Sequence, residues 1–281
     1  MTIRRRRSAL YLPASNRRAI DKARTLAADV VILDLEDAVA PDLKATARAQ
    51  AIAAVAAGGF GGRELVVRVN GLDTDWGADD LRALAAVRPD AILVPKVDDA
   101  AAIGRYATAL GGNDTPIWAM IETTLAVFRL EAIAATRCHG PLAAFVMGTN
   151  DLAREMGAQP DLMRTPFLGI LGLAVAAARA HGLAILDGVF NDIDDLAGLE
   201  TQLRQAVTFG FDGKTLIHPS QIAACNRVFT PDDDAVAAAM RIVAAFDAPE
   251  NAGKGAIRLD GRMVERLHLQ QARRTILAGS D

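Results

Sequence analysis

The sequence predicts an α/β fold of the TIM (β/α)8 barrel class, followed by a C-terminal helical extension. Eight short apolar runs of strand length alternate with alanine-rich stretches that are long enough for a helix. Seven of these runs end in a polar or charged cluster, and successive clusters lie between 26 and 36 residues apart, the length of one strand-helix unit. In such a barrel all strands end on one face, so the clusters would converge on one pocket.

The strand candidates are apolar on nearly every residue, as parallel strands covered on both sides require. The first, at residues 9–12, is closed by Pro13, after which Ser15 or Asn16 can cap a helix that runs through residues 24–28. The other strands are expected at residues 30–33, 65–69, 91–95, 117–121, 143–147, 183–186 and 215–217.

Amphipathic stretches between the strands predict the crossover helices. They cover residues 45–57, 78–87, 98–110 and 168–181, and a last barrel helix is expected near residues 220–228. Glycine-rich turns at residues 58–62 and 111–114 would connect a helix to the next strand at the opposite end of the barrel, a structural role. We therefore place the barrel at residues 1–230 and the extension at residues 231–281, with helices at 233–245 and up to residue 277.

A doubly wound open sheet is the rival architecture for alternating strands and helices. It is disfavoured because no Gly-x-Gly-x-x-Gly motif follows the first strand. The polar strand ends also continue through all the units, whereas an open sheet would concentrate chemistry at one switch point.

Composition narrows the class of protein. A chain of 281 residues with 51% hydrophobic content can bury one large core. The net charge is −3 and no basic stripe extends beyond residues 4–7, so no nucleic-acid partner is expected. No apolar run has the length of a membrane span or of a signal peptide, so we expect no membrane partner and a cytoplasmic location. Cys138 and Cys225 are isolated and are expected to be reduced thiols.

Two carboxylates suggest a metal site. Glu122 and Asp151 end consecutive strand candidates, and neighbouring strands lie about 4.8 Å apart, so the two side chains would face each other across the width of a cation. Such a pair suits Mg²⁺, with Mn²⁺ as the alternative, because these ions bind few carboxylates plus water and substrate oxygens. Each carboxylate could instead only cap the following helix. The presence of Arg68 and Lys96 on adjacent strands favours the metal site.

Arg68 lies inside an apolar strand, where a guanidinium is costly to bury without an anionic partner. That partner is either a substrate oxygen or an internal carboxylate, Glu36 or Asp37, and both arrangements are compatible. Asp34, Glu36 and Asp37 form an acidic strand end. We expect one or two of them to position Arg68, Lys96 or a metal-bound water.

Seven short motifs follow one another over nearly the whole chain, and together they resemble the citrate lyase beta-chain-like branch of the HpcH/HpaI aldolase family, with its citramalyl-CoA and malyl-CoA lyase relatives. The motifs are Leu12-Pro13-Ala14-Ser15-Asn16, Leu33-Asp34-Leu35-Glu36-Asp37-Ala38-Val39-Ala40-Pro41, Val67-Arg68-Val69-Asn70, Val94-Pro95-Lys96-Val97, Met120-Ile121-Glu122-Thr123, Gly148-Thr149-Asn150-Asp151-Leu152 and Gly213-Lys214-Thr215-Leu216-Ile217-His218-Pro219.

The resemblance implies a TIM barrel that cleaves or forms C–C bonds in hydroxyacyl-CoA thioesters with Mg²⁺. By this resemblance Glu122 and Asp151 match the metal ligands, and Arg68 matches the arginine that holds the substrate oxygens. Lys96 is a further substrate-binding candidate, and the segment after the first strand is where the CoA nucleotide would lie. The candidates in that segment are Asn16, Arg17 and Lys22.

The implied reaction is a retro-Claisen cleavage of a short 3-hydroxyacyl-CoA, such as citramalyl-CoA or malyl-CoA, to acetyl-CoA and a 2-keto acid. Arg68 would stabilise the developing enolate, with Glu36 and Asp37 as further catalytic candidates. The acyl group could also be carried by a protein-bound pantetheine. Three alternatives remain open: hydrolysis of the same thioester, a pyruvate-type aldolase acting on free hydroxy acids, and a degenerate barrel without catalysis.

The tail departs from the lyase pattern. In the lyase relatives a tail motif, Gly-x-Met-Ile/Val-Asp-x-Pro, carries an aspartate that enters the neighbouring subunit's site and exchanges a proton with the enolate carbon. Here Glu265 occupies that position, one methylene longer, and Leu267 replaces the proline. Glu265 is therefore either a displaced catalytic residue or a solvated residue at a helix start. If the tail reaches a neighbouring subunit, a homotrimer or homohexamer is expected.

Overall fold

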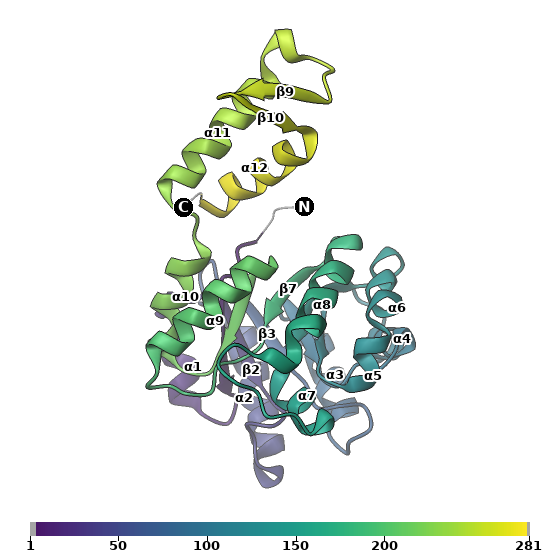
Figure 1. Ribbon diagram of the computed structural model, residues 1–281. Helices are drawn as coiled ribbons and strands as arrows, with labels where there is room; N and C mark the ends of the chain where they lie inside the picture. Colours follow the sequence, from purple (N-terminus) through teal and green to yellow (C-terminus); the bar gives the residue numbers. More distant parts are fainter. Residues whose placement is uncertain (1–3, 280–281) are drawn as a thin grey trace. The chain divides into compact units, whose positions relative to one another are not determined.

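The computed structural model describes residues 4–279, which form two compact units (Figure 1). The first unit is Arg6–Asn226, and the second contains the described residues 4–5 and 227–279. The boundary predicted after residue 230 lies close to this division. Each unit has its own core and is described separately.

The first unit is a closed barrel of eight parallel strands, β1 to β8 in chain order, with β1 paired to β8. The predicted TIM barrel is confirmed, and every predicted strand overlaps an observed one. The strands are β1 Ser8–Pro13, β2 Val30–Asp34, β3 Glu64–Arg68, β4 Ala91–Val94, β5 Ile117–Ile121, β6 Leu142–Met147, β7 Ala184–Asp187 and β8 Gly213–Leu216.

Helices connect successive strands on the outside of the barrel, and one further helix, α10, follows the last strand. They are α1 Arg17–Ala23, α2 Lys44–Ala57, α3 Gly77–Val87, α4 Ala100–Ala109, α5 Thr124–Phe128, α6 Leu130–Ala135, α7 Thr149–Met156, α8 Leu168–Ala180, α9 Leu196–Phe209 and α10 Ile222–Phe229. Short 3-10 turns lie at Pro41–Leu43, Thr136–Cys138, Thr165–Phe167 and Pro219–Gln221. None of the helices in residues 4–279 combines the length and the apolar character that a membrane span requires.

One helix is shorter than predicted. Asn16 caps α1 as expected, because its side chain accepts a hydrogen bond from the Ala19 amide at 3.1 Å. The helix was expected to run through residues 24–28, but it ends at Ala23. The amide and the hydroxyl of Thr25 both donate to the carbonyl of Lys22, at 3.0 and 2.9 Å, and this turn ends the helix.

The barrel interior is filled by alternate residues of the strands. One buried cluster contains Val30 and Ile32 of β2, Val66 of β3, and Trp118 and Met120 of β5. Because successive side chains of a strand point to opposite faces, the next inward positions on β2 and β3 fall at the strand ends. The core therefore determines which polar side chains turn into the barrel mouth.

The second unit contains more than the predicted helices. It comprises α11 Asp233–Asp247, a 3-10 turn at Pro249–Asn251, strands β9 Ala256–Leu259 and β10 Arg262–Glu265, and α12 Arg266–Gly279. The two strands form an antiparallel hairpin between the two expected helices, with Leu259 paired to Arg262. Asp260 and Gly261 form the turn with φ of 50° and 77°, a conformation that an Asp-Gly pair favours. In the barrel unit both cysteines are free, Cys138 exposed and Cys225 buried, and their reduced state remains a prediction.

Candidate active site

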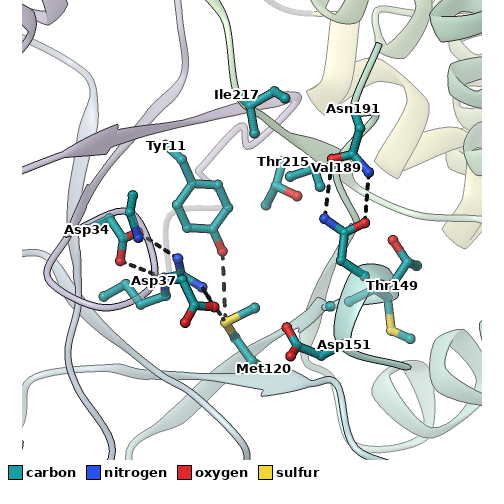
Figure 2. A pocket seen from close by; sticks show the side chains of 15 residues that line it. Tyr11, Asp34, Asp37, Met120, Thr149, Asp151, Val189, Asn191, Thr215 and Ile217 are labelled. Atoms are coloured by element: carbon teal, nitrogen blue, oxygen red, sulfur yellow. Dashed lines mark hydrogen bonds and ion pairs between the residues drawn. The ribbon is translucent and has the colours of Figure 1, made fainter. Parts of the chain in front are cut away.

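A pocket of about 320 Å³ opens at the carboxyl ends of the barrel strands (Figure 2). Its lining comes from β1, β2, β3, β5, β6 and β8, from the start of α7, and from the segments that follow β2, β7 and β8. Residues separated by more than 200 positions in the sequence therefore share one space, as a barrel predicts.

Arg68 and Asp34 form the buried centre of the pocket wall. The guanidinium binds both oxygens of the carboxylate, with Nε 2.7 Å from Oδ1 and Nη2 2.6 Å from Oδ2. Asp34 also accepts the backbone amides of Glu36 and Ala38, at 2.9 and 3.1 Å. The Tyr11 ring lies against the guanidinium, 4.9 Å from its centroid to Cζ. Arg68 is thus held in one orientation by a bidentate ion pair and an aromatic face.

Glu36 and Asp37 approach Arg68 from the segment that follows β2. Glu36 Oε2 lies 2.9 Å from Arg68 Nη1, and its Oε1 accepts a hydrogen bond from Lys96 Nζ at 2.9 Å. Burial raises the pKa of Glu36, although both cations oppose this shift. Asp37 Oδ2 lies 3.9 Å from Nη1, and its side chain is 60% exposed. Since β2 ends at Asp34, strand alternation no longer applies and both residues can reach the same arginine.

Glu122 is the least compensated carboxylate of the site. It is only 1% exposed, its Oε1 accepts the Lys96 amide at 2.8 Å, and its buried Oε2 has no hydrogen-bond partner. Burial and the nearby carboxylate of Glu36 raise the pKa of Glu122 to about 8, and Asp151 contributes in the same direction. Gly148 leaves room for this side chain, because a Cβ there would lie 2.3 Å from Glu122 Cβ.

Glu122 and Asp151 are suited to a divalent cation. An unpartnered buried carboxylate oxygen is costly, and a bound cation would satisfy it. Asp151, at the start of α7, is partly buried and pairs with Arg154 at 2.5 Å. Within residues 4–279 no group of three or more His, Cys, Asp or Glu could hold a metal ion, so water and ligand oxygens would complete the coordination. This donor set is one that Mg²⁺ accepts.

The structure brings six of the predicted site residues together at the barrel mouth. Asp37, Arg68 and Asp151 line the pocket, and Glu36, Lys96 and Glu122 lie behind this lining in contact with it or with one another. The candidates for CoA binding lie elsewhere on the first unit: Asn16 caps α1, Arg17 and Lys22 are exposed on it, and none of the three lines the pocket. Their role in CoA binding remains a prediction.

Glu265 belongs to the second unit, where it ends β10. Its backbone amide donates a hydrogen bond to His268 Nδ1 at 2.9 Å. The predicted entry of this residue into a neighbouring subunit's site remains a prediction.

Several pocket residues were not predicted from the sequence. Tyr11 lines the pocket two positions after the buried Ala9, so the alternation of the first strand was the available signal. Figure 2 shows Asn191 after β7 facing the mouth, where it exchanges two amide hydrogen bonds with Asn150, at 2.9 and 3.2 Å. No signal in the sequence pointed to Asn191, which lies outside the regular elements.

Asp187 also ends a strand, yet it does not line the pocket. It is fully buried, with Oδ2 2.7 Å from Lys214 Nζ and Oδ1 2.6 Å from Arg164 Nη1. Burial alone would raise the pKa of Asp187, but the two cations outweigh it and hold the pKa below its usual range. The polar residues at the end of β7 thus form a buried ion cluster away from the pocket, whereas the cluster around Arg68 lines it.

Comparison with protein families gives a match over most of the barrel. Residues 7–219 match the model of the HpcH/HpaI aldolase/citrate lyase family. The chain is 47% identical over 270 residues to a (3S)-malyl-CoA thioesterase of Cereibacter sphaeroides (strain KD131), covering 96% of this chain and 93% of that protein. It is 38% identical over 294 residues to an L-malyl-CoA/beta-methylmalyl-CoA lyase of Cereibacter sphaeroides (strain ATCC 17029), covering 95% and 92%.

A solved structure shares the architecture. The CitE protein of Mycobacterium tuberculosis, in complex with magnesium, acetoacetate and coenzyme A, superposes with a TM-score of 0.77 at 30% identity. The alignment covers 98% of each chain. Together with the barrel and the polar cluster at its mouth, these matches show that the chain belongs to the HpcH/HpaI aldolase/citrate lyase family.

Proposed function

We propose that this protein hydrolyses the thioester of a short 3-hydroxyacyl-CoA of the malyl-CoA class, with Mg²⁺ as its cofactor. The observation that carries the proposal is the held guanidinium of Arg68 in the pocket wall together with the nearby buried Oε2 of Glu122, which has no hydrogen-bond partner. Hydrolysis is favoured over C–C cleavage because identity is higher to the malyl-CoA thioesterases than to the malyl-CoA lyases.

The charges of the pocket support the proposed substrate class. A malyl group carries a carboxylate next to a hydroxyl, and oxygens of both groups, together with water, would complete the coordination of a cation held by Glu122 and Asp151. Arg68 provides a fixed cation beside that position. The pocket volume, about 320 Å³, suits a short acyl group.

When bound, the divalent cation would supply a positive charge that binds the hydroxy acid oxygens of the substrate. Arg68, immobilised by Asp34 and Glu36, presents a positive charge to the oxygen of the thioester carbonyl, where negative charge develops during attack by water. Asp37, exposed at the wall, takes the proton of that water. The C–S bond then breaks, the thiolate receives the proton, and the products are free CoA and the hydroxy diacid.

The sequence of the C-terminal extension also favours hydrolysis over C–C cleavage. C–C cleavage leaves an enolate whose carbon must be protonated, and the lyase relatives use a tail aspartate for this step. The corresponding residue here is Glu265, without the proline that follows in the lyases. Hydrolysis forms no enolate and needs no such acid. A lyase remains the second candidate, since Arg68, Glu122 and Asp151 match the lyase pattern.

The two reactions are separated by incubating the protein with Mg²⁺ and (3S)-malyl-CoA in water enriched in heavy oxygen, followed by mass spectrometry. Hydrolysis gives free CoA and malate with heavy oxygen in one carboxyl group. Acetyl-CoA with glyoxylate and no labelled malate would replace the hydrolase with the lyase. EDTA should abolish turnover, and restored Mg²⁺ should recover it.

The proposed oligomer and the tail are tested together. Light scattering should give the mass of a homotrimer or homohexamer. Glu265→Asp should raise acetyl-CoA formation from malyl-CoA if the tail reaches a neighbouring site, and no change would leave Glu265 a surface residue.

A further inference from the structure

The acidic segment, residues 35–37, carries Glu36 and Asp37 into the site after β2 has ended. Its backbone is anchored on two sides. The Leu35 amide donates to the Arg68 carbonyl at 2.9 Å, and the carbonyls of Leu35 and Glu36 both accept hydrogen bonds from Lys44 Nζ, each at 2.8 Å. One anchor of this segment is therefore a lysine that does not line the pocket, and it adds to the hydrogen bonds that Asp34 accepts from the amides of Glu36 and Ala38.

Lys44 is the first residue of α2 and is only 6% exposed. Its third hydrogen bond goes to Asn70 Oδ1 at 2.7 Å, and its ammonium lies 5.2 Å from the centroid of the Trp76 ring. An ammonium has three N–H donors, so all of them are used. A lysine buried with three acceptors is held in one geometry, and in turn it fixes the acceptors.

The lysine is itself tied to rigid elements. Asn70 donates its amide and its Nδ2 to Asp80 Oδ2, at 3.1 and 2.7 Å, and Asp80 Oδ1 accepts from Arg48 Nε at 2.6 Å. Lys44 and Arg48 lie one turn apart on α2, and Asp80 is fully buried on α3. The network thus connects the outer helices to the acidic segment.

We propose that Lys44 is a positioning residue: it fixes the carbonyls of Leu35 and Glu36 so that Glu36 holds Arg68 and Lys96 and Asp37 faces the pocket. This inference rests on the proposed function. Lys44 acts through these residues and touches no substrate. A loss of position by about 1 Å at a catalytic group can cost on the order of a hundredfold in rate, so this anchor matters for turnover.

The test compares Lys44→Met, which removes the three donors at similar volume, with Lys44→Arg, which retains the charge. A matched control is Arg179→Met. Arg179 also holds two carbonyls, those of Leu183 and Gly210, and pairs with Asp212, but at the strand starts far from the pocket. Activity is measured on malyl-CoA well below the melting temperature of each variant, together with amide hydrogen exchange of residues 35–39.

Lys44→Met is expected to lower kcat by about 10- to 100-fold with a smaller change in KM, and to accelerate exchange in the acidic segment. Lys44→Arg should recover part of kcat. Arg179→Met should lower the melting temperature and leave kcat unchanged. If Lys44→Met keeps the wild-type kcat, or if Arg179→Met loses as much, the positioning role is overturned.

Two precautions keep the test decisive. If Lys44→Met does not fold, Asn70→Ala is the second variant, because it removes one of the three acceptors of the Lys44 ammonium. It should give a smaller loss of kcat and faster amide hydrogen exchange in residues 35–39. Unchanged kcat and unchanged exchange would overturn the proposal. If the wild-type protein hydrolyses no malyl-CoA, the proposed function fails by itself. Unchanged exchange of residues 35–39 in the Lys44 variants would then still refute the anchoring role.

Discussion

Two buried glutamates at opposite ends of the same barrel show how a structural carboxylate differs from one available to a ligand. Glu64, at the start of β3, is 3% exposed, and Arg6 binds both of its oxygens, at 2.6 and 2.9 Å. Glu122, after β5, is 1% exposed, receives one backbone hydrogen bond and keeps an oxygen without a hydrogen-bond partner. The two side chains are buried to a similar extent, but only the carboxylate of Glu64 is paired with a cation.

The difference extends to the surroundings of each residue. At the strand starts, Asp29 pairs with Arg7 at 2.8 Å and Asp212 with Arg179 at 2.7 Å. At the strand ends, one arginine, Arg68, is approached by three carboxylates. Burying a carboxylate that has no cation of its own lowers the stability of the folded protein. We therefore infer that a cation from solution binds at this end of the barrel and neutralises the excess of carboxylates.

The largest effect is expected for Glu122→Gln. Removing a charged metal ligand should lower Mg²⁺-dependent hydrolysis by about 100-fold or more, because even residues that only support ligands cost up to that factor. The fold should remain, since Gln keeps the shape of the side chain and burial already favours the uncharged form of Glu122 in the metal-free protein. Steady-state kinetics with a Mg²⁺ titration is the measurement, and full activity in this variant would refute the metal site.

Arg68→Lys is expected to lower kcat/KM by about 10- to 100-fold, because an ammonium cannot reproduce the bidentate geometry of the guanidinium. Arg6→Lys is the matched control at the other end of the barrel. It breaks the equivalent pair with Glu64 and should leave kcat/KM unchanged. Equal losses in both variants would show that the two ends do not differ in function.

Mg²⁺ affinity should depend on pH through Glu122. Burial raises the pKa of Glu122 to about 8, so below this pH the metal-free protein carries a proton on Glu122 that Mg²⁺ must displace. The affinity for Mg²⁺ should therefore rise about tenfold per pH unit up to about pH 8.

The stability of the metal-free protein should change in the opposite direction. It should fall as pH rises from the ordinary glutamate range to about 8, because the folded state binds more protons there than the unfolded state. Calorimetric Mg²⁺ titrations at several pH values measure the first effect, and a flat profile would contradict it.

The smallest effect on activity is expected for Glu64→Gln. It leaves the Arg6 guanidinium without its carboxylate, and the free energy of unfolding should fall by about 1–3 kcal/mol. Turnover per folded molecule should not change. Chemical denaturation followed by kinetics at low denaturant separates the two quantities, and a fall in kcat would mean that Glu64 influences the site.

Much of the site could be predicted because it lies in or directly after regular strands. Arg68 stands on an inward position of β3, two residues after Val66, so its direction follows from alternation. Glu122 and Asp151 follow consecutive strands, which places them side by side. The roles of Asn191 and Lys44 could not be predicted from the sequence. Asn191 lies in an irregular segment. The role of Lys44 depends on which backbone carbonyls lie beside the start of its helix in the folded protein.

The sequence by itself determined the number, order and spacing of the strands, and hence the barrel and the end at which polar residues gather, since apolar runs and alternation are local properties of the chain. Only the tertiary structure decided which cation, if any, pairs with the carboxylate at each strand end. Asp187 is enclosed by Lys214 and Arg164, whereas Glu122 retains an oxygen without a hydrogen-bond partner. That distinction depends on side chains far apart in sequence, because the ion pair of a buried carboxylate is set by packing across the barrel and its loops.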